Sequence, residues 1–444
     1  MKTIEIAISG PICASIRPPG SKSITNRALI CAALADGRTT LTGALDSEDT
    51  QVMLDALQTL GLDVAFDREH AVMTVKGCGG SFPVKNAEIY VGNSGTTARF
   101  LAAVLSVSAA RNNDAVRYRI FGKSRMHERP VGDLIASLRQ LGAEIRSESG
   151  NDCPPIIVTK GDHFGGTAEV PGVISSQFLS ALLLASPVSC DEVILTVRGE
   201  LVSKPYIDMT LAVMNAFGAS VEVTSDRSRF MISKTSRYQT SGTMFQYDIE
   251  PDASAAGYFF AAAAVTGGTV TVEGLSQHSL QGDIGFCRCL EQMGCGLAFG
   301  KNSTTVTGRP LCGVTVDMNA ISDTVMTLGV VALFAEGKTR ITHVGHIRYK
   351  ETDRLAALAC ELRKFGATVD EHDDGLEITP PRQIANVPGS QIEIDTYDDH
   401  RMAMSFAVAG LKIPGVVIRD PDCTAKTYPG FFGDLDKIRR PCNV

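Results

Sequence analysis

One pattern of helices and strands recurs six times along this chain of 444 residues. A small polar or charged residue stands at each expected helix start, directly after a short strand, and consecutive starts lie 71 to 79 residues apart. The six starts are Ser23, Thr96, Ser175, Asp252, Asp323 and Asp398. Most of these residue types cap helix N-termini. The period is longer than that of solenoid repeats and therefore indicates duplicated subdomains.

A β-rich stretch and a second helix follow each of these first helices. In the first five units the second helix ends on a related phrase: ALQTLGLDV, LRQLGAEI, MNAFGASV, LEQMGCGL and LRKFGATV. A helical apolar stripe, a Gly just past its end and then alternating apolar residues are typical of a Gly-capped helix that leads into a strand. Each unit therefore reads β-α-β-α-β-β, which makes the chain an α/β protein.

The chain length suits two or three domains, because single cores stop growing at about 250 to 300 residues. Six units divide into two halves of three. The polar, turn-prone segment 236–244 separates the third unit from the fourth, and the rigid Pro18-Pro19-Gly20 offers a second crossing. We expect one domain over 23–241 and the other over 1–22 with 242–444, completed by the N-terminal strand.

Composition narrows the classes of function. Hydrophobic residues make up 44% and charged residues 20% of the chain. Its apolar runs are shorter than a membrane span, and its first ten residues alternate like a strand instead of a signal peptide. We expect a cytoplasmic protein without a membrane partner. The net charge of −7 argues against a nucleic-acid partner.

The 12 cysteines are scattered and accompany no secretory signal, so reduced thiols are a better interpretation than a disulfide framework. Cys287, Cys289 and Cys295 form the densest cluster. No CxxC pair exists and no His stands at metal-finger spacing, so we expect no metal site.

Basic residues gather at or near the expected helix starts. They are Lys22, Arg27, Arg99, Arg125, His127, Arg129, Lys204, Lys350, Arg354, Arg401 and Lys426. Cations are unfavourable where the helix dipole is already positive. A solvated surface charge explains any one of them, but their recurrence in successive units indicates a binding site for an anion.

Neighbouring polar residues allow two interpretations. Ser175 and Ser176 before Gln177 are ordinary N-cap candidates, and the same hydroxyls suit a phosphate. Asp323 is likewise an N-cap candidate. Glu351 lies among cations and would need burial or a ligand to act as a proton donor. Asp252 and the QGD at 281–283 in the fourth unit receive no catalytic role.

Two nucleotide-binding motifs are only approximated. Gly20-Ser21-Lys22-Ser23 lacks the order and the spacing of a P-loop. Gly92-Asn93-Ser94-Gly95 lacks the third Gly and the downstream acid of a dinucleotide fold. Both are anion-friendly turns of another family.

Eight motifs, spread over nearly the whole chain, identify that family. They are PPGSKSITNRAL, GNSGTTAR, RMHERPVGDL, SSQFLSALL, LVSKPYID, RYKETDRL, YDDHRMAM and CTAKTYP. In order and spacing they resemble the motifs of the 5-enolpyruvylshikimate 3-phosphate synthases, the enolpyruvyl transferases of the shikimate pathway. The resemblance implies a two-domain inside-out α/β barrel of six βαβαββ units, three per domain, with buried helices.

The resemblance also implies a reaction. The enolpyruvyl group of phosphoenolpyruvate joins the 5-hydroxyl of shikimate 3-phosphate through a tetrahedral intermediate, and phosphate leaves. It implies two small-molecule substrates and no cofactor or metal. We expect a monomeric enzyme that serves aromatic amino-acid biosynthesis.

Site residues follow from the matching motifs. The implied shikimate 3-phosphate contacts are Lys22, Ser23, Arg27, Ser175, Ser176, Gln177, Ser203, Tyr206, Asp323, His346 and Lys350. The implied phosphoenolpyruvate contacts are Lys22, Gly95, Arg125, Gln177, Arg354, Arg401 and Lys426. Asp323 would be the base for the 5-hydroxyl, Glu351 the acid for the methylene carbon, and Lys22 would assist catalysis.

The sequence departs from the family pattern at two positions, and two alternative functions are open. His346 stands where well-known members have Asn, and Phe100 stands where many have Pro. The sister transferase that acts on UDP-N-acetylglucosamine carries a reactive Cys near the place of Arg125, where this chain has none. A non-catalytic repeat scaffold would need none of these basic residues.

Overall fold

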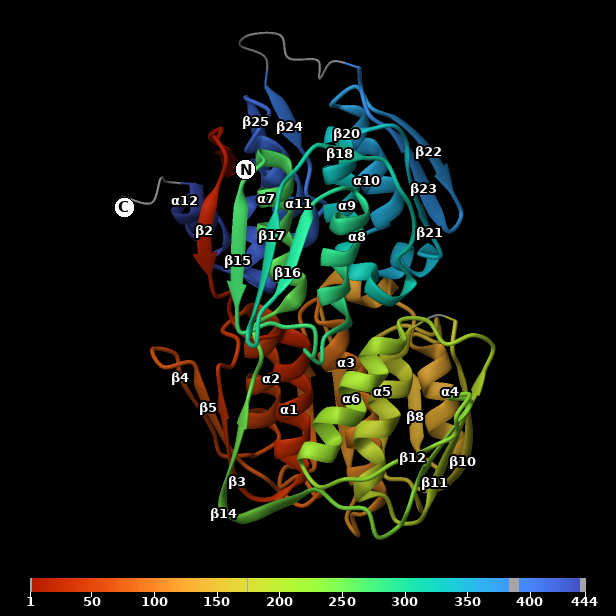
Figure 1. Cartoon of the computed structure of the whole chain (residues 1–444). Helices are drawn as coiled ribbons and strands as arrows, with labels where there is room; N and C mark the ends of the chain where they lie inside the picture. Colours follow the sequence, from red (N-terminus) through yellow and green to blue (C-terminus); the bar gives the residue numbers. More distant parts are fainter. Residues whose placement is uncertain (1, 174, 383–390, 440–444) are drawn as a thin grey trace. The chain divides into compact units, whose positions relative to one another are not determined.

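The computed structural model describes residues 2–173, 175–382 and 391–439 (Figure 1). Its contacts divide the chain into two compact units. We call Gly20–Ile249 the N-domain, and Met1–Pro19 together with Glu250–Val444 the C-domain. The sequence placed the boundaries at 22/23 and 241/242. The second lies later because strand β14 (Gln239–Asp248) pairs with strand β3 (Asp36–Thr42).

The middle unit of the N-domain shows the repeating order most simply. It runs through β6 (Asn86–Tyr90), α3 (Gly95–Ala110), β7 (Arg117–Phe121), α4 (Gly132–Gln140), β8 (Glu144–Ser147) and β9 (Ile156–Thr159), with the 3₁₀ turn η1 (Ser124–Glu128) before α4. Strand β6 is parallel to β7, β7 is antiparallel to β9, and β9 is antiparallel to β8. This unit is the predicted βαβαββ arrangement.

The other two units of the N-domain repeat the same sheet order. One comprises β10 (Gly166–Pro171), α5 (Ser176–Ala185), η2 (Ser186–Val188), β11 (Val193–Arg198), α6 (Lys204–Ala216), β12 (Glu222–Val223) and β13 (Arg229–Ile232). The other comprises α1 (Lys22–Leu34), β3, α2 (Glu48–Thr59), β4 (Val64–Asp67) and β5 (Val72–Lys76), and takes its first strand from β14. The sheet of the first unit is therefore completed only by the strand that follows the third unit.

The C-domain begins its first unit with a strand from the chain's N-terminus. Strand β2 (Cys13–Ile16) is parallel to β15 (Thr269–Glu273). The rest of this unit is α7 (Ala253–Thr266), η3 (Gly282–Gly285), α8 (Phe286–Gln292), β16 (Gly296–Phe299) and β17 (Ser303–Thr307). A short parallel pair, β18 (Leu311–Cys312) with β20 (Ala335–Glu336), follows it.

The last two units complete the C-domain. The fifth comprises β19 (Thr315–Asp317), η4 (Asn319–Thr324), α9 (Val325–Val331), η5 (Ala332–Phe334), β21 (Thr339–Thr342), η6 (Gly345–Tyr349), α10 (Arg354–Arg363), β22 (Thr368–His372) and β23 (Gly375–Thr379). The sixth comprises β24 (Ile392–Ile394), α11 (His400–Gly410), β25 (Val416–Arg419), η7 (Pro421–Lys426) and α12 (Phe431–Arg439). Its described sheet has three strands. In it, β1 (Thr3–Glu5) pairs with β25 in the position that the fourth strand takes in the other units.

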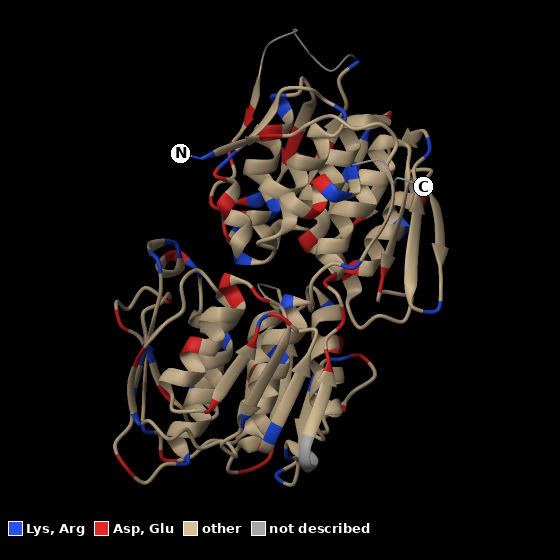
Figure 2. Cartoon of the chain, turned by 90° about the vertical axis from the view of Figure 1, so that its left-hand side faces the viewer, with Lys and Arg blue, Asp and Glu red and all other residues tan. Residues whose placement is uncertain are grey.

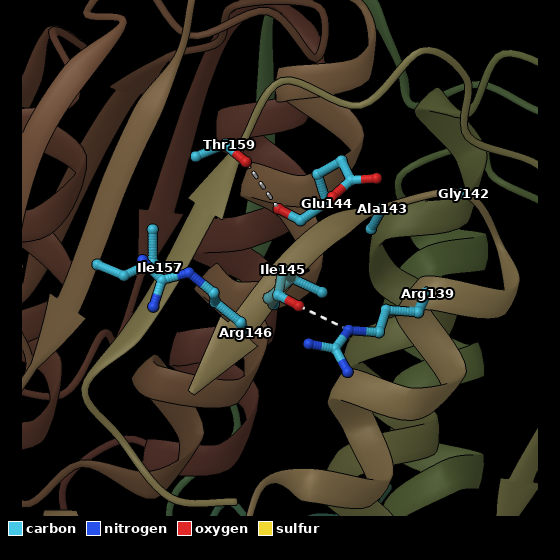
Figure 3. A pocket seen from close by; sticks show the side chains of 8 residues that line it. All are labelled: Arg139, Gly142, Ala143, Glu144, Ile145, Arg146, Ile157 and Thr159. Atoms are coloured by element: carbon cyan, nitrogen blue, oxygen red, sulfur yellow. Dashed lines mark hydrogen bonds between the residues drawn. The ribbon is translucent and has the colours of Figure 1, made fainter. Parts of the chain in front are cut away.

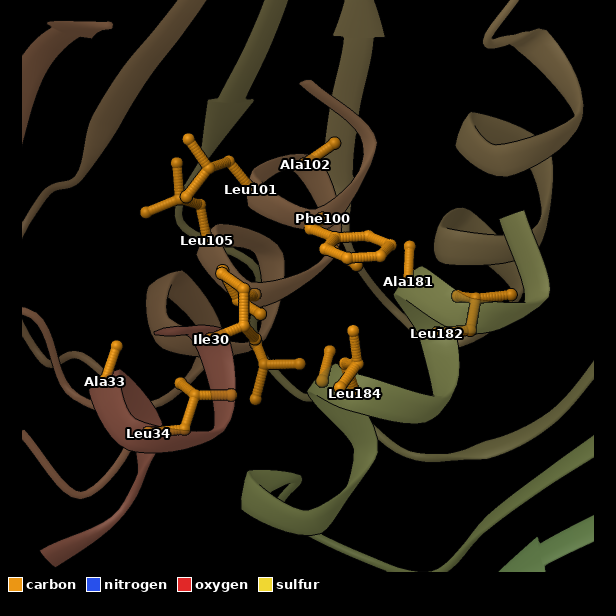
Figure 4. Close-up of a cluster of buried hydrophobic side chains, with 14 of the residues drawn as sticks. Ile30, Ala33, Leu34, Phe100, Leu101, Ala102, Leu105, Ala181, Leu182 and Leu184 are labelled. Carbon is orange, nitrogen blue, oxygen red and sulfur yellow. The ribbon is translucent and has the colours of Figure 1, made fainter. Parts of the chain in front are cut away.

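Helices form the interior of each domain. Every residue of α7, α9 and α11 is buried, and so is every residue of α3 except Ala110. A helix that is apolar on all faces needs neighbours on all faces. Figure 4 shows this packing in the N-domain, where Ile30 of α1, Phe100 of α3 and Leu182 of α5 converge. The predicted inside-out α/β fold is confirmed.

Several helix starts differ from the prediction by one or two residues. Ser175 and Asp252 are N-caps as expected, but Ser21, Ser94 and Asp399 take the places assigned to Ser23, Thr96 and Asp398. Asp323 is no N-cap. It lies in η4, and its side chain points to cations instead of to backbone N–H groups.

Candidate active site

Asp323 of the C-domain lies between two arginines. Its Oδ1 is 3.1 Å from Nη1 of Arg354, and its Oδ2 is 2.7 Å from Nη2 of Arg401. Arg354 is the first residue of α10 and Arg401 the second of α11. Both guanidinium side chains are nearly inaccessible, with 1% and 7% exposed. One carboxylate thus joins the starts of two helices from successive units.

Glu351 is held in the same way by two cations. Its Oε1 accepts a hydrogen bond from Nζ of Lys426 at 2.7 Å, and its Oε2 lies 2.8 Å from Nη2 of Arg354. The Glu351 side chain is 8% exposed. A buried carboxylate between two cations is stabilised as the anion. Both oxygens of Glu351 contact cations, one from η7 and one from α10.

Asp399 completes this network. Its Oδ2 accepts from Nε of Arg354 at 2.8 Å, and its Oδ1 lies 3.3 Å from Nη2 of the same guanidinium. Burial lowers the pKa of Arg354, but Asp399, Glu351 and Asp323 raise it by more, so the guanidinium stays charged. The sequence pattern did not single out Asp399.

His346 and Lys350 lie beside Asp323. Nζ of Lys350 is 3.5 Å from Asp323 Oδ1. Burial is the main cause that lowers the pKa of Lys350, and Asp323 opposes it. Burial, and after it the charge of Lys350, lower the pKa of His346 to about 4. At neutral pH His346 is therefore an uncharged hydrogen-bonding group.

The charges of this group of side chains do not balance. The cations are Lys350, Arg354, Arg401 and Lys426, and the carboxylates are Asp323, Glu351 and Asp399. Four positive charges against three negative ones leave one surplus positive charge. We call these seven residues the C-domain cluster. A small anion with oxygens in one plane suits its arginines.

Arg27 is one of the buried cations of the N-domain. Its Nε donates to Thr210 Oγ1 at 2.7 Å and its Nη1 to the carbonyl of Ser23 at 2.9 Å. Its guanidinium carbon lies 5.4 Å from the centre of the Phe100 ring. Burial lowers the pKa of Arg27 to about 10, so it remains charged at neutral pH. Its hydrogen-bond partners are neutral, which leaves its charge available to an anion.

Gln177 is fixed by Arg99 at the starts of two neighbouring helices. Nη1 of Arg99 donates to Gln177 Oε1 at 2.9 Å and to the carbonyl of Gly95 at 3.3 Å. Arg129 donates to the carbonyl of Asn93 at 2.9 Å. A side chain at Gly95 would collide with both guanidinium groups. The absence of a side chain at Gly95 therefore lets both guanidinium groups pack against this helix start.

The serines of the N-domain differ in their local roles. Ser175 caps α5 by accepting from the backbone N–H of Gln177 at 3.2 Å. Ser176 is buried. Ser203 is also buried, and it precedes α6 in a left-handed conformation, with φ of 53°, without a side-chain cap. Tyr206 follows in the first turn of α6, and its carbonyl accepts from Arg27 Nη2 at 3.4 Å.

Lys22 and Arg125 have acidic neighbours. Lys22 Nζ is 3.4 Å from Asp49 Oδ2, and both side chains are largely buried. Arg125 pairs with Glu128 at 2.7 Å in η1 and is 36% exposed. Of the two side chains, that of Lys22 is the more buried.

The structure groups more residues than the sequence did. It adds Asp399 to the C-domain cluster, and it adds Asp49, Arg99 and Arg129 to the candidate site of the N-domain. Arg99 and Arg129 are basic residues near helix starts that the matching motifs did not assign to either substrate. For Asp399, an acidic residue two positions before Arg401 was the available signal. Asp49 lies in the acidic first turn of α2 and offered no such signal.

Other features lie apart from these residues. A depression at the end of α4 and along β8 and β9 is lined by Arg139, Gly142, Ala143, Glu144, Ile145, Arg146, Ile157 and Thr159 (Figure 3). Arg139 donates there to the carbonyl of Ile145 at 2.8 Å. None of the predicted site residues lines it. In the view of Figure 2, Lys and Arg are interspersed with Asp and Glu over both domains.

The cysteine cluster and the unassigned motifs have structural roles. Cys287, Cys289 and Cys295 are buried free thiols, and burial raises the pKa of each. Within the described ranges, no group of three His, Cys, Asp or Glu could hold a metal ion. Asp252 caps α7, and Gln281 Oε1 accepts from the backbone N–H of Ala253 at 3.0 Å, so the two motifs of the fourth unit bind each other. Among the helices of the described residues, none is long and apolar enough to span a membrane.

The fold of this chain is that of a class of solved structures, the enolpyruvyl transferases. The enolpyruvyl transferase NikO from Streptomyces tendae superposes with a TM-score of 0.75, at 18% identity over 98% of this chain and 96% of that one. EPSP synthase from Acinetobacter baumannii gives a TM-score of 0.78, at 25% identity over 99% of this chain and 98% of that one.

Sequence comparison narrows the class to one family. The EPSP synthase (3-phosphoshikimate 1-carboxyvinyltransferase) family model matches residues 6–435. The 3-phosphoshikimate 1-carboxyvinyltransferase of Proteus mirabilis is 46% identical over 96% of each chain. The chloroplastic enzyme 1 of Nicotiana tabacum is 46% identical over 97% of this chain and 83% of its own length. The chain belongs to the EPSP synthase family, as the motifs predicted.

Proposed function

We propose that this chain transfers the enolpyruvyl group of phosphoenolpyruvate to the 5-hydroxyl of shikimate 3-phosphate, releasing inorganic phosphate. Family membership over residues 6–435 supports the reaction. The observation that supports the site is the C-domain cluster. Ion pairs link five of its residues in series: Asp323, Glu351, Arg354, Arg401 and Lys426. These residues come from segments that lie far apart in the sequence, and the fold brings them to one place.

Phosphoenolpyruvate carries a phosphate and a carboxylate. We assign its binding to Arg354, Arg401 and Lys426 of the C-domain and to Lys22, Gly95, Arg125 and Gln177 of the N-domain. The surplus positive charge of the C-domain cluster supports this assignment, because guanidinium groups bind phosphate and carboxylate oxygens in pairs. Arg99 and Arg129 add positive potential around Gly95.

Shikimate 3-phosphate carries a carboxylate, a phosphate and two free hydroxyls. We assign its carboxylate to Ser23 and Arg27, and its phosphate to Ser175, Ser176 and Ser203 with Tyr206 and Lys22 near them. Its hydroxyls would contact Gln177, Asp323, His346 and Lys350. Arg27 supports this scheme because its partners in the N-domain are neutral.

The proposed chemistry uses two carboxyl groups. Asp323 accepts the 5-hydroxyl proton as the oxygen attacks C2 of phosphoenolpyruvate, and Glu351 protonates the C3 methylene. The tetrahedral intermediate then breaks down: the Glu351 carboxylate takes a proton from C3 as the bond between C2 and the phosphate oxygen breaks, which restores the double bond. Asp323 is a weak proton acceptor while it pairs with Arg354, Arg401 and Lys350. Substrate anions would draw these cations away and make Asp323 more basic.

Partners and location follow from the family. We propose a monomer in the cytoplasm that uses no metal or organic cofactor and binds neither nucleic acid nor membrane. The net charge of −7 supports the absence of a nucleic-acid partner.

The test is release of phosphate from phosphoenolpyruvate by the purified protein. Shikimate 3-phosphate, UDP-N-acetylglucosamine and no acceptor are compared in parallel. We expect release with the shikimate ester alone, and its absence would refute the proposal. Arg401→Ala should lose most activity, whereas Arg419→Ala, a change at a partly exposed ion pair with Asp395, should retain it.

A further inference from the structure

Asp399 connects the two arginines of the C-domain cluster. It holds Arg354 at two points, with Oδ2 2.8 Å from Nε and Oδ1 3.3 Å from Nη2. The same Oδ1 accepts from the backbone N–H of Arg401 at 2.9 Å, which caps α11. Its side chain is 0% exposed. One buried carboxylate therefore binds one arginine and fixes the helix that carries the other.

This arrangement offsets an electrostatic cost. Arg354 and Arg401 stand in the first turns of α10 and α11, where the helix dipole repels cations. An Asp at the N-cap of α11 places negative charge at that end of the helix. The ion pair with Arg354 restricts the guanidinium plane, because Nε and Nη2 both point at the carboxylate. Nη1 of Arg354 then points to Asp323.

Asp323 is less suited than Asp399 to hold the two arginines in fixed positions. It also contacts both arginines, but its side chain is 12% exposed. In the proposed reaction Asp323 changes partners and accepts a proton. Asp399 is inaccessible and belongs to the helix terminus itself, so its position does not depend on substrate.

We propose that Asp399 is the positioning residue of the C-domain cluster: it orients Arg354 and caps the helix of Arg401, so that both guanidinium groups are arranged for phosphoenolpyruvate before it binds. The proposal rests on the proposed function, and it assigns Asp399 no contact with substrate. Arrangement in advance matters because a displacement of a binding group by about 1 Å can cost about 100-fold in rate.

The test separates the charge of Asp399 from its capping role. Asp399→Asn keeps an N-cap oxygen, since Asn caps as well as Asp, but it removes the charge that holds Arg354. We expect KM for phosphoenolpyruvate to rise about 10- to 100-fold, by analogy with a displaced binding group. KM for shikimate 3-phosphate should change less than about threefold. Asp399→Ala loses both roles and should be worse.

Asp353→Asn is the matched control. Asp353 caps α10 and pairs with Arg348 at 2.8 Å, so it is also an N-cap aspartate with an arginine partner, but its side chain is 42% exposed and its partner lies outside the cluster. This variant should keep both KM values within about twofold of wild type. If Asp399→Asn does not fold, Asp399→Ser provides a smaller neutral cap for the same comparison.

Each outcome decides the proposal. A variant that merely folds poorly would lower kcat and leave both KM values unchanged, and this result would overturn a positioning role. So would a KM for phosphoenolpyruvate within twofold of wild type. If the wild-type protein releases no phosphate with shikimate 3-phosphate, the proposed function itself fails. If wild type and Asp399→Asn are equally active, only the role of Asp399 fails.

Discussion

Lys426 and Glu351 form a buried ion pair in the C-domain, with Nζ 2.7 Å from Oε1 and side chains 9% and 8% exposed. The other oxygen of Glu351 faces Arg354 at 2.8 Å. Both carboxylate oxygens of Glu351 therefore face cations. In the proposed reaction the ammonium group of Lys426 is the nearest proton source for Glu351, and a ligand anion that engages Arg354 would favour this transfer.

Glu351→Gln tests the acid. The amide keeps the size of the side chain but cannot donate a proton to carbon. We expect kcat to fall by about 100-fold or more, in line with the usual contribution of a general acid. Binding of shikimate 3-phosphate, measured by calorimetry, should stay within about threefold of wild type. Normal turnover would remove Glu351 from the role of proton donor.

His346→Asn tests the pH dependence of stability. The pKa of His346 is about 4 in the folded protein, below the ordinary value of 6.5. Between these values the unfolded chain binds a proton that the folded chain does not, so His346 makes stability fall as the pH falls from 6.5 to 4. Above pH 6.5 it contributes no pH dependence.

Asn does not titrate, so the variant should lose less of its thermal midpoint between pH 7 and pH 5 than wild type does. His70→Asn is the control, because His70 is exposed. It pairs only with Asp67 at the surface, as far as the described residues show. Equal slopes for wild type and His346→Asn would show that His346 is not kept neutral by burial.

Thr210→Val tests whether the hydrogen bond from Arg27 to Thr210 positions the guanidinium group. The hydroxyl of Thr210 accepts from Arg27 Nε at 2.7 Å and donates to the carbonyl of Tyr206 at 2.7 Å. A hydrogen bond to a charged group contributes about 1.5 to 3 kcal/mol, so we expect KM for shikimate 3-phosphate to rise about tenfold. KM for phosphoenolpyruvate should change less than twofold. Thr210→Ser keeps the hydroxyl and should restore the wild-type value; failure to do so would indicate a packing defect instead.

Gly95→Ala tests the space at the start of α3. The added methyl group would collide with the guanidinium groups of Arg99 and Arg129, and these must move. Since Arg99 fixes Gln177, we expect KM for phosphoenolpyruvate to rise about tenfold as binding groups are displaced. Gly433→Ala, in α12, meets no atom within 4 Å and should leave both KM values unchanged. An unaltered KM in Gly95→Ala would place phosphoenolpyruvate elsewhere.

The helix starts show which features local sequence patterns can predict. Ser175 and Asp252 were predicted as N-caps and are N-caps, because capping involves residues only two or three positions apart. Asp323 has the same local pattern and is not a cap. Its partners Arg354 and Arg401 lie 31 and 78 positions along the chain, beyond any local rule.

The sequence by itself determined the six-unit α/β plan, the buried first helices and the family, because apolar periodicity, capping residues and contiguous motifs are local properties. Only the tertiary structure decided which strands complete which sheets, as when β14 joins β3 and β2 joins β15. It also decided the pairing of charges. Asp399 became part of the site only where α10 and α11 bring its carboxylate within 2.8 Å of Arg354, since electrostatic partners are selected by distance in space.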